Sequence, residues 1–138
     1  THTNWGSWKK KHPHAKVLSD KTGFRRPYDR DPYQGYESNS RLMFDVRLMS
    51  SKYPPKEKVI GIEMDGKAKA YPFSELNKSR SPVTDIFNKM PIQIFYDRKT
   101  RTAVIKDSKD KELPSVVGFW FAWFAFHPET KVFVAEKR

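Results

Sequence analysis

The chain has 138 residues, of which 37% are hydrophobic and 31% are charged, and its formal net charge at pH 7 is +11. This length allows one domain with its own core, and the absence of cysteine excludes disulfide scaffolds, thiolate metal sites and cysteine nucleophiles. No hydrophobic run approaches the roughly 18 residues that a membrane-spanning helix needs. The positive charge favours anionic partners but does not indicate a fold.

One motif occurs near both ends of the chain, in residues 5–18 and 120–133. Both copies contain W-x-x-W-x-x-x-H-P, and six identities recur at a constant offset of 115 residues. The proline ends the helix that the tryptophan spacing predicts, and a short strand (KVL or KVF) is expected to follow. We interpret the two segments as copies of one supersecondary unit. The identical residues of the first copy are Trp5, Trp8, His12, Pro13, Lys16 and Val17, and those of the second are Trp120, Trp123, His127, Pro128, Lys131 and Val132.

The histidine of the motif has two readings. As the last residue before the proline it can cap the helix and stabilise the negative end of the helix dipole. Alternatively, His2, His12 and His14 could bind a metal ion, since imidazole is a common ligand. The second copy keeps His12 as His127 but has Glu129 in place of His14. We therefore favour capping and expect neither a metal nor another cofactor, although His2 near the amino terminus could chelate copper weakly.

Residues 19–40 contain no hydrophobic periodicity and predict a long loop rich in arginine and tyrosine. Arginine binds carboxylate, sulfate or phosphate with two parallel hydrogen bonds, and tyrosine adds a stacking face and a hydroxyl. This composition is typical of a site for a small anionic ligand. The preferred reading is nevertheless structural, with the tyrosines packed on the sheet and the arginines paired with Asp29 and Asp31. The candidate ligand-binding residues are Arg25, Arg26, Tyr28, Arg30, Tyr33 and Tyr36.

The middle of the chain predicts strands. The clearest signal is Asp65–Gly66 between two β-rich arms, which is typical of a hairpin. A one- to two-turn helix is expected from Pro72 to Leu76. Together these elements predict a single α+β domain over residues 1–138, with a mostly antiparallel sheet and two short tryptophan-bearing helices. The predicted strands cover residues 42–46, 59–63, 68–71, 83–87, 92–96 and 102–105.

The two copies of the motif differ in their surfaces. The first carries Lys9–Lys11 and should lie on the surface, whereas residues 119–126 of the second are almost entirely hydrophobic. Trp120, Trp123 and Phe124 are candidates for an interface with a partner, but a helix that closes the sheet is the preferred reading. If a hydrophobic face stays uncovered, a homodimer or a companion subunit is expected.

Several segments together resemble the prokaryotic domain of unknown function 3179 family. The resemblance implies that the chain corresponds to the C-terminal half of a tandemly duplicated protein. It also implies export, so an extracytoplasmic (periplasmic or secreted) location is expected from the resemblance alone. The segments that carry it are TGFRRPYDRDPYQGYE (22–37), PPKEKVIG (54–61), VIGIEMDGKAKAYPFSEL (59–76), V-x-D-x-F-N (83–88), PIQIFYD (91–97) and both W-x-x-W-x-x-x-H-P motifs.

The chain departs from the family at the end of strand 92–96. In the first half of full-length relatives this strand leads into a Tyr-Cys-Pro-Leu segment, which suggests redox or metal chemistry. Tyr96 and Thr102 match that pattern here, whereas Asp97 stands where the thiol would be and Arg101 replaces a glycine. We expect Asp97 to form a turn, so the thiol chemistry of the family does not extend to this chain.

Other chemistry is less well supported. The carboxylates Glu63, Asp65 and Asp85 are not predicted to form an acid–base pair, and no serine-hydrolase, zincin or Walker motif is present. Lys9–Lys11, Arg25–Arg26 and Arg98–Arg101 could contact phosphates. Acidic residues are interspersed along the chain and no nucleic-acid-binding motif accompanies these groups, so a nucleic-acid partner is not expected.

The expected function is therefore a non-catalytic binding or assembly domain that recognises a small anionic ligand or a partner subunit. Two alternatives stay open. The first is an enzyme or redox accessory domain whose thiol chemistry resides on a partner or on another half of the protein. The second is nonspecific binding of polyanions such as nucleic acids.

Overall fold

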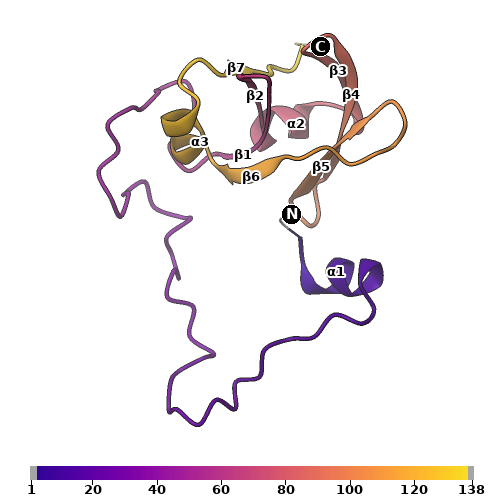
Figure 1. Cartoon of the computed structure of the whole chain (residues 1–138). Helices are drawn as coiled ribbons and strands as arrows, with labels where there is room; N and C mark the ends of the chain where they lie inside the picture. The colour runs from indigo at the N-terminus through magenta and orange to yellow at the C-terminus, as the bar shows by residue number, and fades with distance from the viewer. Residues whose placement is uncertain (1–2, 137–138) are drawn as a thin grey trace.

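The computed structural model describes residues 3–136, which form three helices and seven strands (Figure 1). The fold is α+β and dominated by strands, as the sequence predicts. Every strand pair is antiparallel except the short parallel pair of β2 with β7. The elements in chain order are α1 (Trp5–Lys11), β1 (Lys58–Met64), β2 (Lys67–Pro72), α2 (Phe73–Lys78), β3 (Val83–Phe87), β4 (Met90–Asp97), β5 (Thr102–Asp107), β6 (Val116–Phe119), α3 (Trp120–Phe126) and β7 (Lys131–Val132).

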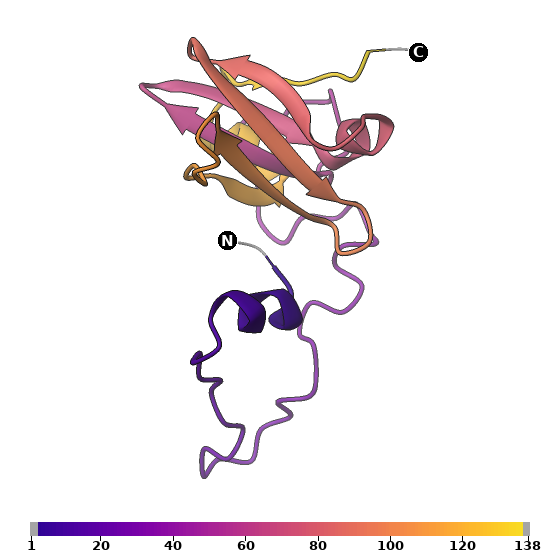
Figure 2. The same ribbon diagram turned by 90° about the vertical axis from the view of Figure 1, so that its right-hand side faces the viewer.

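The strands form two sheets, one with the order β6-β1-β2-β7 and one with the order β3-β4-β5 (Figure 2). Ile60 and Ile62 of β1 are buried together with Ile92 and Ile94 of β4. Val59 lies on the opposite face of β1, in a second cluster with α3. Because β1 is covered on both faces, its V-I-G-I run needs no alternation of polar and hydrophobic residues.

The predicted hairpin is confirmed. β1 and β2 pair in antiparallel register from Val59↔Pro72 to Met64↔Lys67. Asp65 and Gly66 both have positive φ, at 51° and 71°. Two central residues with positive φ are the requirement of a type I′ turn, and the twist of that turn matches the twist of the flanking strands. The short helix expected near Pro72 is also present, as α2.

Two predicted strands are wrong and one strand was missed. Residues 42–46 and 16–18 have strand-like composition, but neither segment pairs with a strand in the part of the chain that the structure describes. Without an edge to complete, their β propensity has no hydrogen-bonding partner. β6 was missed because its hydrophobic residues run directly into those of α3, which hides the change of period between strand and helix.

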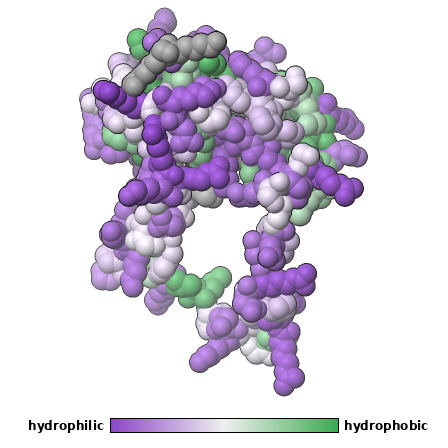
Figure 3. Space-filling view, turned by 180° about the vertical axis from the view of Figure 1, so that it is seen from behind, coloured by the Kyte–Doolittle hydropathy of each residue, from purple (hydrophilic) through white to green (hydrophobic). Residues whose placement is uncertain are grey.

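Residues 3–56, here called the N-terminal arm, lie outside both sheets; residues 57–136 are called the sheet body. The arm contains α1 and otherwise irregular backbone, and Figure 3 shows it as a loop that stands away from the sheet body. Ten of its large hydrophobic side chains are exposed, although such residues are normally buried. They are Trp5, Val17, Leu18, Phe24, Tyr28, Tyr33, Met43, Phe44, Leu48 and Met49.

The end of the arm is fixed to the sheet body by polar contacts. The indole of Trp120 donates to the carbonyl oxygen of Ser50 at 3.2 Å, and the hydroxyl of Tyr53 donates to Glu75 at 3.2 Å. Glu75 is buried and also accepts from the backbone N–H of Ala135 at 3.2 Å. Burial and the neighbouring Glu75 carboxylate raise the pKa of Tyr53 to about 12.

None of the described helices combines the length and hydrophobicity that crossing a bilayer requires.

Candidate functional site

The arginine- and tyrosine-rich segment is held by local turns. The side chain of Asp31 accepts from the N–H of Tyr33 at 2.8 Å, and the N–H of Tyr36 donates to the carbonyl oxygen of Tyr33 at 2.8 Å. The hydroxyls of Thr22 and Tyr28 are 2.6 Å apart. These contacts span only a few residues each, so they shape the segment without attaching it to the sheets.

Tyr36 attaches the segment to the sheet body. Its ring meets Phe119 edge-on at a centroid distance of 6.1 Å. Within the arm, the Lys56 ammonium lies 3.5 Å from the Tyr36 ring centroid, in a cation–π contact. Glu37 forms an ion pair with Lys58 at 2.9 Å. The structure places Arg25, Arg26, Tyr28, Arg30 and Tyr33 on the exposed part of the arm. Among the described residues it brings these five neither into a cavity nor onto the sheet.

The positive charge of the chain is concentrated in the arm. Residues 3–56 contain 12 lysines and arginines against 5 aspartates and glutamates, a net charge of +7. Residues 57–136 contain 13 against 11, a net charge of +2. An exposed segment with this charge attracts anionic surfaces over distances of about a Debye length.

Asp97, where the resemblance noted above places a thiol, shapes a turn. Its Oδ1 accepts from the backbone N–H of Lys99 at 2.8 Å and of Thr100 at 3.3 Å. These backbone N–H groups, that of Thr100 foremost, lower the pKa of Asp97. Arg101 has a φ of 50°, a conformation that glycine adopts more readily. The geometry therefore gives Asp97 a structural role.

The two neighbours of Asp97 that match the family pattern are also part of this structure. Tyr96 is buried, and its ring packs on Phe73 at a centroid distance of 4.9 Å. The hydroxyl of Thr102 lies 2.8 Å from that of Thr100. Tyr96, Asp97 and Thr102 all border one shallow surface depression. Asp97 presents a hydrogen-bonded carboxylate there.

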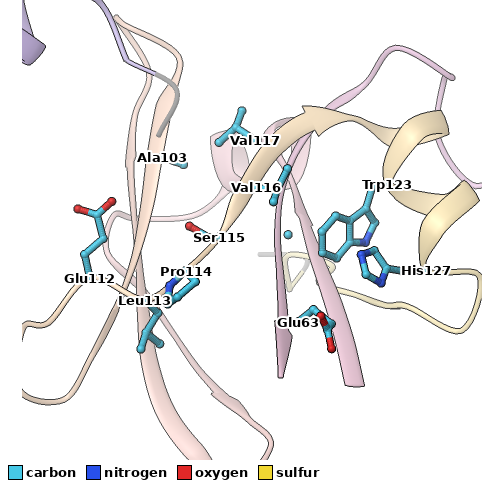
Figure 4. Close-up of a pocket in the computed structure, with 11 residues that line it drawn as sticks. Glu63, Ala103, Glu112, Leu113, Pro114, Ser115, Val116, Val117, Trp123 and His127 are labelled. Atoms are coloured by element: carbon cyan, nitrogen blue, oxygen red, sulfur yellow. The ribbon is translucent and has the colours of Figure 1, made fainter. Parts of the chain in front are cut away.

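A larger cavity of about 630 Å³ lies where the β6 end of the first sheet meets the loop after β5 (Figure 4). Trp123 and His127 form one wall, with ring centroids 4.1 Å apart. Glu63 lies below them and Glu112 at the opposite end. The described residues that line the cavity include the carboxylates Glu63 and Glu112 and no lysine or arginine, so it suits a cationic group better than an anion.

Glu112 and His127 both line this cavity, although no sequence pattern joins them. They come from segments that have no common motif, and only the tertiary structure places them together. Lys11 of the arm forms an ion pair with Glu112 at 3.8 Å, so the arm reaches the edge of this cavity.

His2, one of the three candidate metal ligands of the sequence, lies outside the described residues.

The preferred reading of α3, a helix that closes the sheet, fits the structure better than the candidate interface. Trp120 is 1% exposed and Trp123 is 7% exposed, and both pack against the first sheet, so they are core residues and not available to a partner. Phe124 is partly buried beside Trp120, at a centroid distance of 5.4 Å. The hydrophobic side chain that α3 does expose is Phe126, at 84%.

The two W-x-x-W-x-x-x-H-P segments have the same local geometry. His12 ends α1 with φ −132° and ψ 72°, and His127 ends α3 with φ −132° and ψ 67°. Each histidine donates its backbone N–H to the carbonyl oxygen of the second tryptophan, at 2.9 Å for His12 and 3.0 Å for His127. Each imidazole also packs on that tryptophan ring, with centroids 4.0 and 4.1 Å apart.

Comparison with known proteins identified one family. DUF3179, described as "Protein of unknown function", matches residues 1–113. The matched residues include the arm, both strands of the β1–β2 hairpin and the Asp97 turn, and they end before α3. No curated protein and no solved structure matches the chain.

Proposed function

The chain belongs to the DUF3179 family, and from this premise we propose that it is a non-catalytic binding or assembly domain that joins a partner subunit through its N-terminal arm. The observation that carries the proposal is the composition of the exposed arm. It displays ten large hydrophobic side chains and a net charge of +7 on backbone that forms no sheet.

The physical reason is the cost of exposing hydrophobic surface to water, about 25 cal/mol per Å². An exposed segment that carries many such side chains recovers this free energy when it wraps a complementary surface. The excess of lysine and arginine favours a partner that is acidic around its hydrophobic contacts. Either a second copy of the chain or a companion subunit can present such a surface.

The resemblance to exported relatives supports an extracytoplasmic location as part of this proposal. Asp97 supports the absence of catalysis by this chain. Its Oδ1 accepts backbone hydrogen bonds within a turn, at the position where the resemblance places a thiol in relatives. If a partner supplies that thiol, the chain is an accessory domain to its chemistry.

The proposal can be tested by cross-linking with a lysine-reactive reagent in the source cells, followed by mass spectrometry. Lysines occur in both regions, for example Lys9, Lys21 and Lys52 in the arm and Lys99 and Lys109 in the sheet body. We expect links to a partner to map to arm lysines. Links confined to the sheet body, or a chain that stays monomeric and unlinked, would refute the proposal.

A small anionic ligand is the second candidate for what the arm binds, because Arg25 and Arg30 are exposed on it. If Arg25 and Arg30 bind one, replacing both with alanine should reduce the affinity for AMP or galacturonate at least tenfold, as measured by isothermal titration calorimetry. The Tm should stay unchanged, because both side chains are exposed on the arm.

Lys9→Ala/Lys10→Ala is the matched control, since it also removes two positive charges from the arm. It should retain binding, because lysine lacks the planar fork of arginine. Equal losses in the two variants would indicate nonspecific charge attraction. If the unaltered chain binds neither anion, the partner subunit remains as the proposed ligand.

A further inference from the structure

The second W-x-x-W-x-x-x-H-P segment has an identifiable mechanical role in the sheet body. α3 lays Trp120 and Trp123 over β1, where the Trp123 ring occupies the space above Gly61. Past the proline, β7 then adds in parallel to the edge of β2, with Ala70 opposite Val132. Residues 120–133 thus form a helix–strand unit that covers one face of the sheet and completes one edge.

Residues 5–18 have the same helix and the same C-terminal cap, but they lie on neither sheet of the described part of the chain. α1 has no buried residue. Trp5, whose counterpart Trp120 is 1% exposed, is 48% exposed. Val17 is 66% exposed and Leu18 is 97% exposed, although their counterparts Val132 and Phe133 both pack on the sheet body. The first unit therefore presents a docking surface without a sheet beneath it.

We propose that residues 5–18 close the sheet of a second domain that has the same architecture as the sheet body. In this arrangement Trp5 and Trp8 lie on that sheet, with a glycine beneath Trp8, and residues 16–18 add as a parallel edge strand. The inference deepens the proposed function, since it names the kind of partner that the arm binds. The sheet body of this chain is not the acceptor, because its own α3 already occupies that face.

The difference between the two units at the last residue of the helix fits this placement. At the end of the helix Lys9–Lys11 replace Phe124–Phe126, and Phe126 is 84% exposed on the docked helix. A lysine at that last position therefore keeps its charge in water after docking. The 31 residues from 19 to 49 can span about 100 Å when extended, so docking places no strain on the sheet body.

The test grafts the first unit onto the sheet whose structure is known. In the full chain, residues 120–133 are replaced by the sequence of residues 5–18, which changes eight positions and keeps six. The control graft contains the same 14 amino acids with the tryptophans moved out of their i, i+3 spacing. A second pair of grafts keeps Phe124, Thr130 and Phe133, which make contacts of their own in the sheet body.

In at least one pair, the graft with the native order should unfold in a single cooperative thermal transition with a blue-shifted tryptophan emission. Its Tm should be lower than that of the unaltered chain but well above that of its scrambled control. If neither of the two native-order grafts has a higher Tm than its scrambled control, the inference is wrong.

A separate variant distinguishes this inference from the proposed function. Trp5→Ala/Trp8→Ala in the otherwise unaltered chain should leave the Tm unchanged, because α1 buries no side chain. It should also abolish the cross-links from Lys9 and Lys16 to the partner. Persistent links from these lysines would overturn the inference and leave arm-mediated assembly intact. A successful graft without any arm cross-link would instead refute the proposed function.

Discussion

Replacing Gly61 with alanine is expected to lower the free energy of unfolding by about 3 kcal/mol, at the upper end of the usual cost of overpacking a core. A Cβ at this position would lie 2.3 Å from Cζ3 of Trp123. The ring cannot move away cheaply, because its Nε1 donates to Thr130 at 2.9 Å and its face packs on His127 at 4.1 Å. Urea denaturation, followed by circular dichroism, measures the loss.

Gly118→Ala is the matched control. Gly118 lies in the neighbouring strand β6, and no atom of the described residues other than its chain neighbours would lie within 4 Å of its added Cβ. The change should be neutral or slightly stabilising, by roughly 0.5 kcal/mol, because alanine restricts the unfolded chain. Trp123→Phe should relieve part of the effect of Gly61→Ala by shrinking the ring. Equal destabilisation by the two glycine substitutions would show that steric contact with Trp123 is not the cause.

Replacing Asp85 with alanine is expected to lower the free energy of unfolding by about 2–3 kcal/mol, because it removes the acceptor of two buried or partly buried donors. The hydroxyl of Tyr71, a fully buried residue, donates to Asp85 at 2.8 Å. Lys69 forms an ion pair with the same carboxylate oxygen. Since Asp85 belongs to β3 and the other two residues to β2, this cluster joins the two sheets.

The effect of Asp85 should depend on pH. Burial raises the pKa of Asp85, but hydrogen bonds from Lys69 and Tyr71 outweigh burial and hold the pKa below its usual value. The folded state therefore favours the ionised carboxylate. Its contribution is complete above the unfolded pKa of about 4 and is lost as the pH falls through the lower folded pKa. The stability difference between the unaltered chain and Asp85→Ala should thus shrink between about pH 5 and pH 2.

A double-mutant cycle with Tyr71→Phe isolates the hydrogen bond. Without the tyrosine hydroxyl, Asp85→Ala should cost less, because only Lys69 then loses its partner. Additive effects of the two substitutions would contradict the proposed coupling.

The Asp85→Ala variant should still lose stability in acid, because the pKa of Glu75 is also held below its usual value in the folded state.

Local features of this protein could be predicted from the sequence because they depend on a few neighbouring residues. Asp65–Gly66 specifies its hairpin, since both residues tolerate the positive φ that the turn requires. The His–Pro pair ends each tryptophan-bearing helix at the same point. The arginines and tyrosines of residues 25–36 were correctly placed in a long loop. Their ligand stays a prediction.

The tertiary structure alone decided which of these features are buried. The two W-x-x-W-x-x-x-H-P segments have nearly the same local conformation, yet only the second lies on a sheet, because only it finds Gly61 and the edge of β2. Strand-like residues 42–46 pair with no strand of residues 3–136 for the same reason. Dihedral preferences and periodicity act over a few residues, whereas burial and strand pairing require surfaces that distant parts of the chain supply.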